Sequence, residues 1–182
     1  GINIDMTPVK SGERYFYVWS HRKNIGTPLD TGSMLMIAEF DPVHPEQLIS
    51  EPKCLSRPLY GFENPEHTIN NEGPYAFYYN NKIYLAYSGG DARGYLYAIG
   101  MLTANDGDDL CDLSVWEKAK TPIASFATIP GEYGPGHNSF FWDRDQNLWI
   151  AYHAVTSFEE KIVSSGMRRV YFEQDKTPRF DV

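Results

Sequence analysis

Several features that define particular protein classes are rare or missing in this sequence of 182 residues. Its two cysteines, Cys54 and Cys111, show neither a metal-ligand spacing nor a disulfide framework. A single disulfide bond and two free thiols are both compatible with the sequence, and two buried thiols are favoured. No run of about 18 apolar residues occurs, so we expect neither a membrane-spanning helix nor a membrane partner. Lysine and arginine number 16 against 24 acidic residues, and the net charge of −8 argues against nucleic acid as a partner.

Aromatic residues, in contrast, are abundant. They make up 15% of the chain, with 13 Tyr, 10 Phe and 4 Trp. Aromatic side chains favour β-strands, and they also line sugar-binding clefts. The length suits one domain, because single domains commonly have about 100–200 residues. The composition therefore predicts one mainly β domain and gives a weaker indication of carbohydrate binding.

A strand pattern recurs three times along the chain. The segments RYFYVWS, KIYLAYS and NLWIAYH end at residues 20, 88 and 153, so they repeat at intervals of 68 and 65 residues. Each has a partner segment before it, joined by a turn. A further strand is expected after each one, at 33–40, 95–102 and 168–174, and outer fourth strands are expected within 52–58 and 116–124.

Repeated units of three or four antiparallel strands are typical of the blades of a β-propeller. We therefore predict an all-β fold of the propeller type, with blades at approximately 1–64, 65–130 and 131–182. Helix should be nearly absent, with at most a short turn near 44–50 or 111–118.

One ionisable residue lies at the entry of the first strand in each unit. The offsets to the ends of the repeated segments are 15, 16 and 16 residues, from Asp5 to Ser20, from Glu72 to Ser88 and from His137 to His153. The first strand of a propeller blade lines the central channel, so side chains at equivalent positions meet near the axis. Taken singly, the two acids are typical turn residues and the histidine is typical of a loop. Their shared place in the repeat instead favours one common site at one end of the channel.

The segments INIDMTPVKSGERYFYVWS, NNEGPYAFYYNNKIYLAYSGG and YGPGHNSFFWDRDQNLWIAYHA resemble the inner blades of glycoside hydrolase family 43. The closing RRVYFEQDKTPRF resembles that family's last strand, and MLTANDGDDLCDLSVWEKAKTPIA is most similar to arabinofuranosidase-like members. The resemblance implies a five-bladed β-propeller. It also implies an inverting hydrolase of O-glycosidic bonds in arabinose- or xylose-containing plant polysaccharides and oligosaccharides, with no required cofactor.

The resemblance assigns roles to individual residues. Glu72 matches the general acid, and Asp5 matches an aspartate that orients the acid and tunes its pKa. His137 matches an axial histidine at the substrate site, which in many members lies close to a bound calcium or water; a Ca²⁺ ion is therefore allowed there, held directly or through water. Arg169 matches an arginine that reaches the sugar, with Arg168 as the alternative.

Aromatic residues near these positions are candidates for the apolar walls of the substrate site. Tyr75 and Phe140 are the two that we assign to substrate binding. Strand alternation directs some aromatic residues into the core between blades, and core packing is the commoner role for any one of them.

The main departure from the family pattern concerns the general base. In the family this aspartate lies on the first blade, whereas the present chain begins where a third blade is expected, and five such units would need roughly 300 residues. We expect the missing N-terminal blades, or a second chain, to complete the propeller and supply the base. No signal peptide is visible at Gly1; a secreted or periplasmic location is favoured and a cytoplasmic one stays open.

Two other classes of function stay open. One is a non-catalytic carbohydrate-binding or scaffold propeller, and the other is a protein-interaction propeller without a sugar site. The presence of both Asp5 and Glu72 favours the enzyme, because binding alone needs neither acid. The sequence does not separate an arabinofuranosidase from a xylosidase or an arabinanase, since specificity depends on loop shape around the channel.

Overall fold

The computed structural model describes residues 1–157, 159 and 162–180 of the chain. Its strands form three larger antiparallel sheets and one small hairpin. The first sheet contains β1 (Ile2–Ser11), β2 (Arg14–Arg22), β3 (Met34–Glu39) and β4 (Lys53–Ser56). The second contains β5 (Asn71–Tyr79), β6 (Lys82–Gly89), β7 (Ala98–Asn105) and β8 (Glu117–Lys118). The third contains β9 (Tyr133–Trp142), β10 (Leu148–Val155) and β11 (Val163–Arg169), and the hairpin pairs β12 (Tyr171–Phe172) with β13 (Pro178–Arg179).

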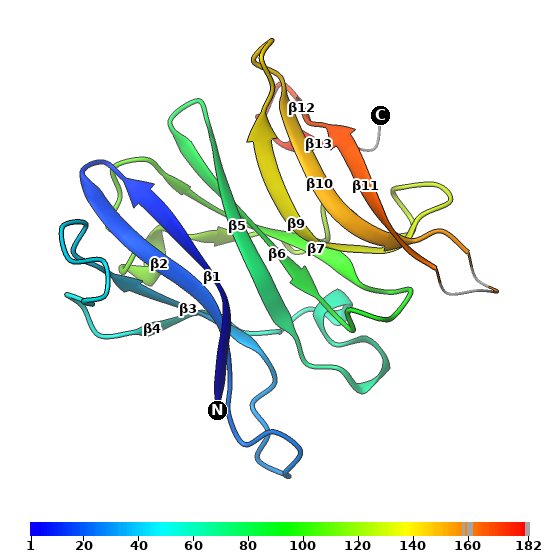
Figure 1. The fold of residues 1–182 in the computed structure, drawn as a ribbon, viewed down its shortest axis with the longest axis horizontal. Helices are drawn as coiled ribbons and strands as arrows, with labels where there is room; N and C mark the ends of the chain where they lie inside the picture. Colours follow the sequence, from blue (N-terminus) through cyan, green and yellow to red (C-terminus); the bar gives the residue numbers. More distant parts are fainter. Residues whose placement is uncertain (158, 160–161, 181–182) are drawn as a thin grey trace.

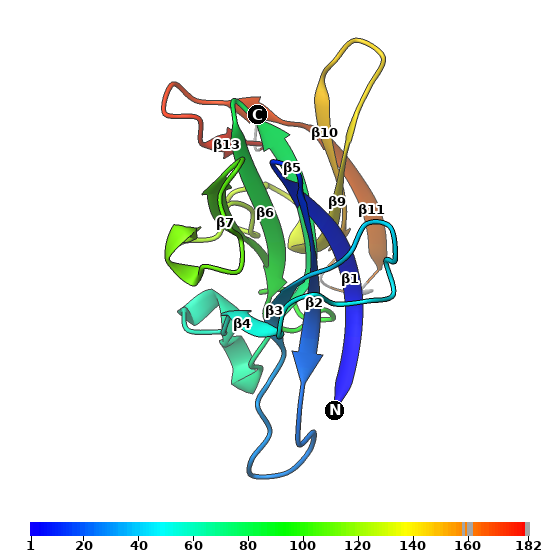
Figure 2. The same cartoon turned by 90° about the vertical axis from the view of Figure 1, so that its left-hand side faces the viewer.

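The three larger sheets are arranged as the blades of a propeller. In each blade the first strand lies at the edge of the sheet, and the following strands are added outward in chain order. Figure 1 shows β1, β5 and β9 side by side, and Figure 2 shows the sheets fanning away from them. This arrangement confirms the expected all-β fold, the innermost strands, and the outer strands β4 and β8.

The expectation for the third strand of the last blade is wrong. The third strand of the last blade is β11 (Val163–Arg169) and not 168–174; its pairing with β10 ends at Arg169 opposite Trp149. The chain then turns away, and Phe172 of β12 stacks on Tyr79 of β5 with ring centroids 3.7 Å apart. Burial of that aromatic pair against a neighbouring blade separates the last hairpin from the third sheet.

Helix is limited, in the described part of the chain, to three short 3₁₀ segments: η1 (Gly61–Glu63), η2 (Pro65–His67) and η3 (Leu113–Val115). The last lies within the expected 111–118, whereas the first two were not expected. No helix among the described residues is long and apolar enough to cross a membrane.

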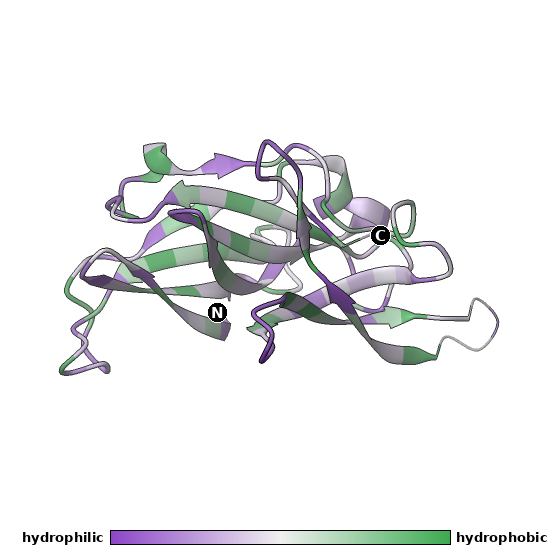
Figure 3. Cartoon of the chain, turned by 90° about the horizontal axis from the view of Figure 1, so that it is seen from above, coloured by the Kyte–Doolittle hydropathy of each residue, from purple (hydrophilic) through white to green (hydrophobic). Residues whose placement is uncertain are grey.

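The hydrophobic core lies between neighbouring blades. Phe16, Leu35, Leu85 and Tyr87 belong to the cluster between the first and second blades. A second cluster joins the second blade to the third, and Phe77 packs there against the aromatic rings of its neighbours. Figure 3 shows the hydrophobic residues as bands along the strands. Almost every residue of β6 is buried, which is typical of a strand covered on both faces.

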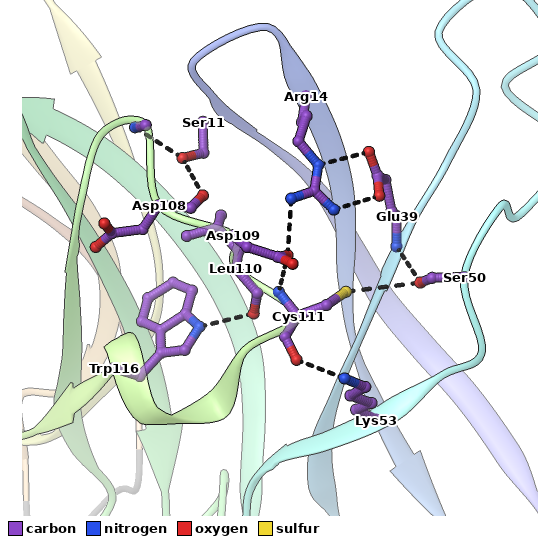
Figure 4. Close-up of polar contacts among 11 residues, drawn as sticks. Ser11, Arg14, Glu39, Ser50, Lys53, Asp108, Asp109, Leu110, Cys111 and Trp116 are labelled. Atoms are coloured by element: carbon purple, nitrogen blue, oxygen red, sulfur yellow. Dashed lines mark hydrogen bonds and ion pairs between the residues drawn. The ribbon is translucent and has the colours of Figure 1, made fainter.

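A polar seam reinforces the junction of the first two blades at their outer side (Figure 4). Arg14 of β2 makes a two-pronged ion pair with Glu39 of β3, at 2.8 and 2.6 Å, and also contacts Asp109 of the second blade at 3.0 Å. Lys53 of β4 donates to the backbone carbonyl of Cys111 at 2.8 Å. The loop after β7 is thereby fixed to the first blade.

Both cysteines are free thiols. Cys111 is buried, and Cys54 is half-buried beside Met34. Of the two states left open by the sequence, the structure therefore contains the thiols.

Candidate active site

Each innermost strand carries a β-bulge at the same level of the channel. The last regular pairs before the bulges are Ile4–Ser20, Glu72–Ser88 and Gly136–His153. The next residue has a positive φ in all three blades, 57° at Asp5, 56° at Gly73 and 50° at His137. Residues other than glycine rarely adopt this conformation, and such strain is concentrated at functional sites. The bulges identify one level of the channel as the place to look for chemistry.

The register corrects the alignment suggested by the sequence offsets. Asp5 and His137 occupy the same bulge position, but its counterpart in the second blade is Gly73, and Glu72 lies one residue earlier. The equal offsets of Glu72 and His137 misled because the third hairpin has a longer turn, residues 143–147, than the first two. The offset of Asp5 is one residue shorter, and this difference is the shift between Asp5 and Glu72. As a result Glu72 lines a cavity of ≈ 390 Å³, whereas Asp5 and His137 line an adjacent one of ≈ 420 Å³.

Asp5 of the first blade contacts residues of the second and third blades. Its Oδ2 accepts hydrogen bonds from the backbone N–H of Gly73 and from the hydroxyl of Ser20, each at 3.3 Å. Its Oδ1 lies 3.7 Å from Nε2 of His137, close enough for an ion pair when the imidazole is protonated. Asp5 therefore reaches the backbone next to Glu72 and the side chain of His137, but it is not bonded directly to the Glu72 carboxyl in the described structure.

Two serines connect the blades at this level. The backbone N–H of Gly73 donates to Ser20 at 3.2 Å, and the backbone N–H of His137 donates to Ser88 at 2.7 Å. In both cases the bulge of one blade is bonded to the end of the middle strand of the blade before it. The sequence signal was present, since VWS and AYS end at these serines, but serine alone does not indicate a contact to a later blade.

Glu72 accepts a hydrogen bond from a buried tyrosine that sequence reasoning missed. The hydroxyl of Tyr97 donates to Oε1 of Glu72 at 2.7 Å. Tyr97 lies immediately before β7 and is 0% exposed. Burial raises the pKa of Tyr97 well above its usual value of 10.0, and the charge of Glu72 raises it further. Tyr97 therefore stays protonated and acts as a hydrogen-bond donor.

The cavity at Glu72 is polar. Arg22 lines it and is held by Asp30 through two parallel hydrogen bonds of 2.8 and 2.7 Å. The guanidinium lowers the pKa of Asp30 well below its usual value, because it stabilises the carboxylate. Asp91 also lines the cavity and accepts a hydrogen bond from the backbone of Arg93. The cavity thus presents hydrogen-bonding groups of both charges beside a half-buried carboxyl.

A second histidine lies behind His137. The rings of His137 and His153 are stacked with centroids 6.3 Å apart, and His153 stacks in turn on Tyr97 at 5.6 Å. Burial lowers the pKa of His153 below its usual value of 6.5, and the nearby His137 acts in the same direction. His153 is therefore predominantly neutral at pH 7.

The donors around His137 are few for a metal ion. Among the described residues, no group of three or more His, Cys, Asp and Glu side chains is placed to hold one. His137 and Asp5 offer two side chains, whereas Ca²⁺ takes six to eight oxygen ligands, so most of a calcium shell would have to come from backbone oxygens or water. A Ca²⁺ ion at this position stays a prediction.

The remaining candidates fall into two groups. Tyr75 is 37% exposed and lines the cavity with Asp5 and His137, a position compatible with sugar contact. The assignment of Phe140 to substrate binding is corrected by the structure. Phe140 is 6% exposed and packs on Phe77 in the core, with ring centroids 4.4 Å apart. It points between the blades because its place in the strand alternates with that of the exposed Phe141.

The two arginine candidates do not lie with this cluster. Arg169 is exposed on the third strand of its blade and places its guanidinium over the ring of Tyr171, at 5.1 Å. Arg168 is engaged with Glu132 and Tyr152, at 2.8 Å from each. Both project from an outer strand, so the structure assigns them local contacts within the last blade and its hairpin.

Comparison with known proteins agrees with this architecture. The model of the family "Glycosyl hydrolases family 43" matches residues 2–178. An extracellular exo-α-(1→5)-L-arabinofuranosidase of Streptomyces avermitilis is 28% identical over 99% of this chain and 38% of its own length. The enzyme of that name from Streptomyces chartreusis is 35% identical over 79% of this chain and 42% of its own length. The crystal structure of an α-L-arabinofuranosidase from Lactobacillus brevis superposes with a TM-score of 0.83 at 27% identity, covering 98% of this chain and 55% of that one.

The chain is a β-propeller segment of the glycosidase type and belongs to glycosyl hydrolase family 43. It spans about two fifths of the length of the curated arabinofuranosidases that it matches, at 38% and 42%.

Proposed function

We propose that this chain supplies the general acid of an inverting glycoside hydrolase that cleaves α-L-arabinofuranosidic bonds in arabinose- or xylose-containing saccharides. One observation carries the assignment of Glu72. Its carboxyl is half-buried at the edge of a polar cavity and has a fixed donor, Tyr97, on one oxygen. A carboxyl in such a position can hold a proton and release it to a ligand in the cavity. Family membership and the names of the related enzymes support the substrate class.

The reaction requires two carboxyl groups. Glu72 gives its proton to the glycosidic oxygen while the bond from that oxygen to the anomeric carbon breaks, and the bonding electron pair stays on the departing oxygen. A water oxygen bonds to the anomeric carbon from the opposite face, and its proton passes to a carboxylate base. In inverting enzymes the two carboxyls are about 6.5–9.5 Å apart, which leaves room for the water.

Within the described part of the chain, the lining of the Glu72 cavity offers no uncommitted carboxylate to act as the base. The two other carboxylates that line the Glu72 cavity, Asp30 and Asp91, are engaged by Arg22 and by a backbone turn. We propose that further blades, on the same polypeptide or on a second chain, contribute the base and close the channel. The related enzymes named extracellular support a secreted location for the complete protein.

Asp5 is assigned a positioning role. Its carboxylate holds the backbone N–H of Gly73 and faces His137, so it fixes the bulge that follows Glu72. Its negative charge also disfavours ionisation of a nearby acid, which keeps a proton available.

The proposal is tested with Glu72→Gln in the full-length protein, with Glu51→Gln, an exposed position, as the matched control. Loss of general acid catalysis is commonly worth about 10²–10⁴-fold. We expect a loss of that size in kcat/KM for arabino-oligosaccharides and a smaller loss for an aryl arabinoside whose leaving group needs little protonation. Equal losses on both substrates would remove Glu72 from the acid role.

A second experiment concerns the 182-residue chain alone. We expect negligible hydrolysis of aryl arabinosides and aryl xylosides, because an acid without a base cannot activate water on the opposite face. Robust turnover by the purified chain would demand a base within residues 1–182 and would overturn this account.

A further inference from the structure

The hydrogen bond that its hydroxyl group makes explains why a tyrosine is found at position 97. It lies at the seam between the second and third blades, fully buried, and its hydroxyl is directed at Oε1 of Glu72, 2.7 Å away. A tyrosine that served packing alone would gain nothing from a buried hydroxyl, because an unpaired buried hydroxyl is unfavourable and phenylalanine has the same ring.

The third blade is built to admit this ring. A Cβ atom on Gly136 would lie 2.1 Å from Cε1 of Tyr97, so only glycine fits at that position of β9. The ring of His153 stacks against Tyr97 with an interplanar angle of 12°. Ser88 contributes a further hydrogen bond to the Tyr97 hydroxyl. The ring therefore has one position, and its hydroxyl has one carboxyl oxygen within reach.

We propose that Tyr97 is a positioning residue that fixes Glu72 through Oε1 and thereby leaves Oε2 to carry the catalytic proton. This inference depends on the proposed role of Glu72 as the acid. In a neutral carboxyl group the oxygen without the proton is the better acceptor, so a donor fixed on Oε1 directs the proton to Oε2. The transferred proton then always starts from Oε2, the oxygen that Tyr97 does not engage. Fixed orientation of a proton donor is one of the ways in which an active site lowers a barrier.

The same blade contains a matched control. Tyr87 is also 0% exposed and donates to a glutamate, Oε1 of Glu63, at 2.7 Å. A Cβ atom on Gly100 would lie 2.4 Å from Cζ of Tyr87, just as Gly136 is required by Tyr97. Glu63 does not line the cavity at Glu72. Removal of the Tyr87 hydroxyl thus repeats the chemical change without touching the proposed acid.

The test compares Tyr97→Phe with Tyr87→Phe in the full-length protein. Hydrogen bonds to charged groups contribute enough for a change of about 10- to 100-fold when one is lost. We expect Tyr97→Phe to lower kcat by that factor for arabino-oligosaccharides, with KM little changed and with a smaller loss for an activated aryl arabinoside. We expect the ratio of the two substrates to be unchanged in Tyr87→Phe.

The pH profile provides a readout that packing would not move. The alkaline limb of kcat/KM falls where the general acid loses its proton. A donor bonded to a carboxylate favours the ionised form, so loss of the Tyr97 hydroxyl should move this limb to higher pH. An unmoved limb together with equal losses on both substrates would overturn the positioning role.

Further measurements distinguish failure of the inference about Tyr97 from failure of the proposed role of Glu72. If Tyr97→Phe does not fold, 3-fluorotyrosine at position 97 keeps the ring and supplies a stronger donor, and the alkaline limb should then move to lower pH; no movement would overturn the inference. If Glu72→Gln loses activity equally on both substrates, the proposed acid role itself fails. If Glu72→Gln behaves as expected and Tyr97→Phe does not, only the inference about Tyr97 fails.

Discussion

Two glutamates, Glu63 in the connection before the second blade and Glu72 on its first strand, each accept a hydrogen bond from a buried tyrosine, yet their surroundings differ completely. Glu63 is 0% exposed, and five donors surround its carboxylate. These donors are the backbone N–H groups of Leu59 and Tyr60, the amide of Asn71, the hydroxyl of Tyr87 and, at 2.5 Å, the ammonium of Lys118. Glu72 has the Tyr97 hydroxyl and borders a cavity.

The difference shows what separates a structural carboxylate from a chemical one. Both carboxylate oxygens of Glu63 are occupied by donors, so the whole group is engaged in contacts within the protein. Glu72 is held at Oε1 by one side-chain donor, Tyr97, and lines a cavity. A tyrosine–glutamate pair therefore carries no function by itself; the number of other donors and access to the cavity decide its role.

The largest expected difference between substitutions of the two glutamates is in the stability of the folded chain. Glu63→Gln should lower the free energy of unfolding of the chain by about 3–5 kcal/mol, because it removes a fully buried charge and leaves the half-buried Lys118 without its counter-charge. Glu72→Gln keeps a carbonyl acceptor for the Tyr97 hydroxyl and only weakens that hydrogen bond at a partly exposed site, so it should cost about 1 kcal/mol. Urea unfolding followed by tryptophan fluorescence measures both. Similar losses in the two variants would show that Glu72 is as structural as Glu63.

Gly100 and Gly136, which contact the two buried tyrosines, allow the same difference to be tested through packing. Gly100→Ala and Gly136→Ala should each cost about 1–3 kcal/mol of stability, since each inserts a methyl group into a buried tyrosine ring. Gly136→Ala should in addition raise the dependence of kcat on the leaving group in the full-length protein, because it displaces Tyr97. A change of leaving-group dependence in Gly100→Ala as well would attribute the effect to general loosening of the blade.

Asp5→Asn acts on the charge near the acid and should have a milder effect. Removal of a negative charge makes ionisation of neighbouring acids easier, so the alkaline limb of kcat/KM should move to lower pH, opposite to Tyr97→Phe. KM should change little, because the shape of the side chain is kept. The pH dependence of kcat/KM for one aryl arabinoside checks this, and movement in the same direction as in Tyr97→Phe would contradict the assigned role.

The smallest expected effect concerns the pH dependence of stability. Burial holds the pKa of His153 below 6.5, so the unfolded chain binds more protons than the folded chain in the pH window just below that value. Stability should therefore decrease as pH falls from 7.5 through about 6.5, and it should decrease less in His153→Phe. Urea unfolding at pH 7.5 and 5.5 measures the slope. An unchanged slope in the variant would assign the titration to other groups.

Much of the fold followed from local patterns. Alternating aromatic and aliphatic residues before and after short turns predicted the hairpins, and their repeat predicted the blades, because strand pairing within a hairpin depends on neighbours in sequence. The last blade was the exception. Residues 168–174 have a strand pattern, but stacking of Phe172 on Tyr79 in another blade takes part of that segment out of the third sheet.

The site was predicted in outline and not in register. Asp5, Glu72 and His137 lie near one level of the channel, but a longer turn in the third hairpin hid the one-residue shift between Glu72 and His137. Phe140 illustrates the other limit. An aromatic residue in an inner strand suits a sugar site and a core equally well, and only its contact with Phe77 decides between them.

The sequence by itself indicated the propeller blades, through residue types at fixed local spacing, and the family and candidate acid, through the resemblance of its motifs to family 43. Only the tertiary structure distinguishes Glu72, which lines a cavity, from the fully buried Glu63. Tyr87 and Tyr97 are both buried beside a glutamate, and the distinction depends on Lys118, on backbone N–H groups and on a cavity formed by segments that are distant in sequence. Hydrogen bonds and electrostatic interactions act over a few ångströms in space whatever the separation along the chain, so the chemistry of Glu72 became defined when the blades packed together.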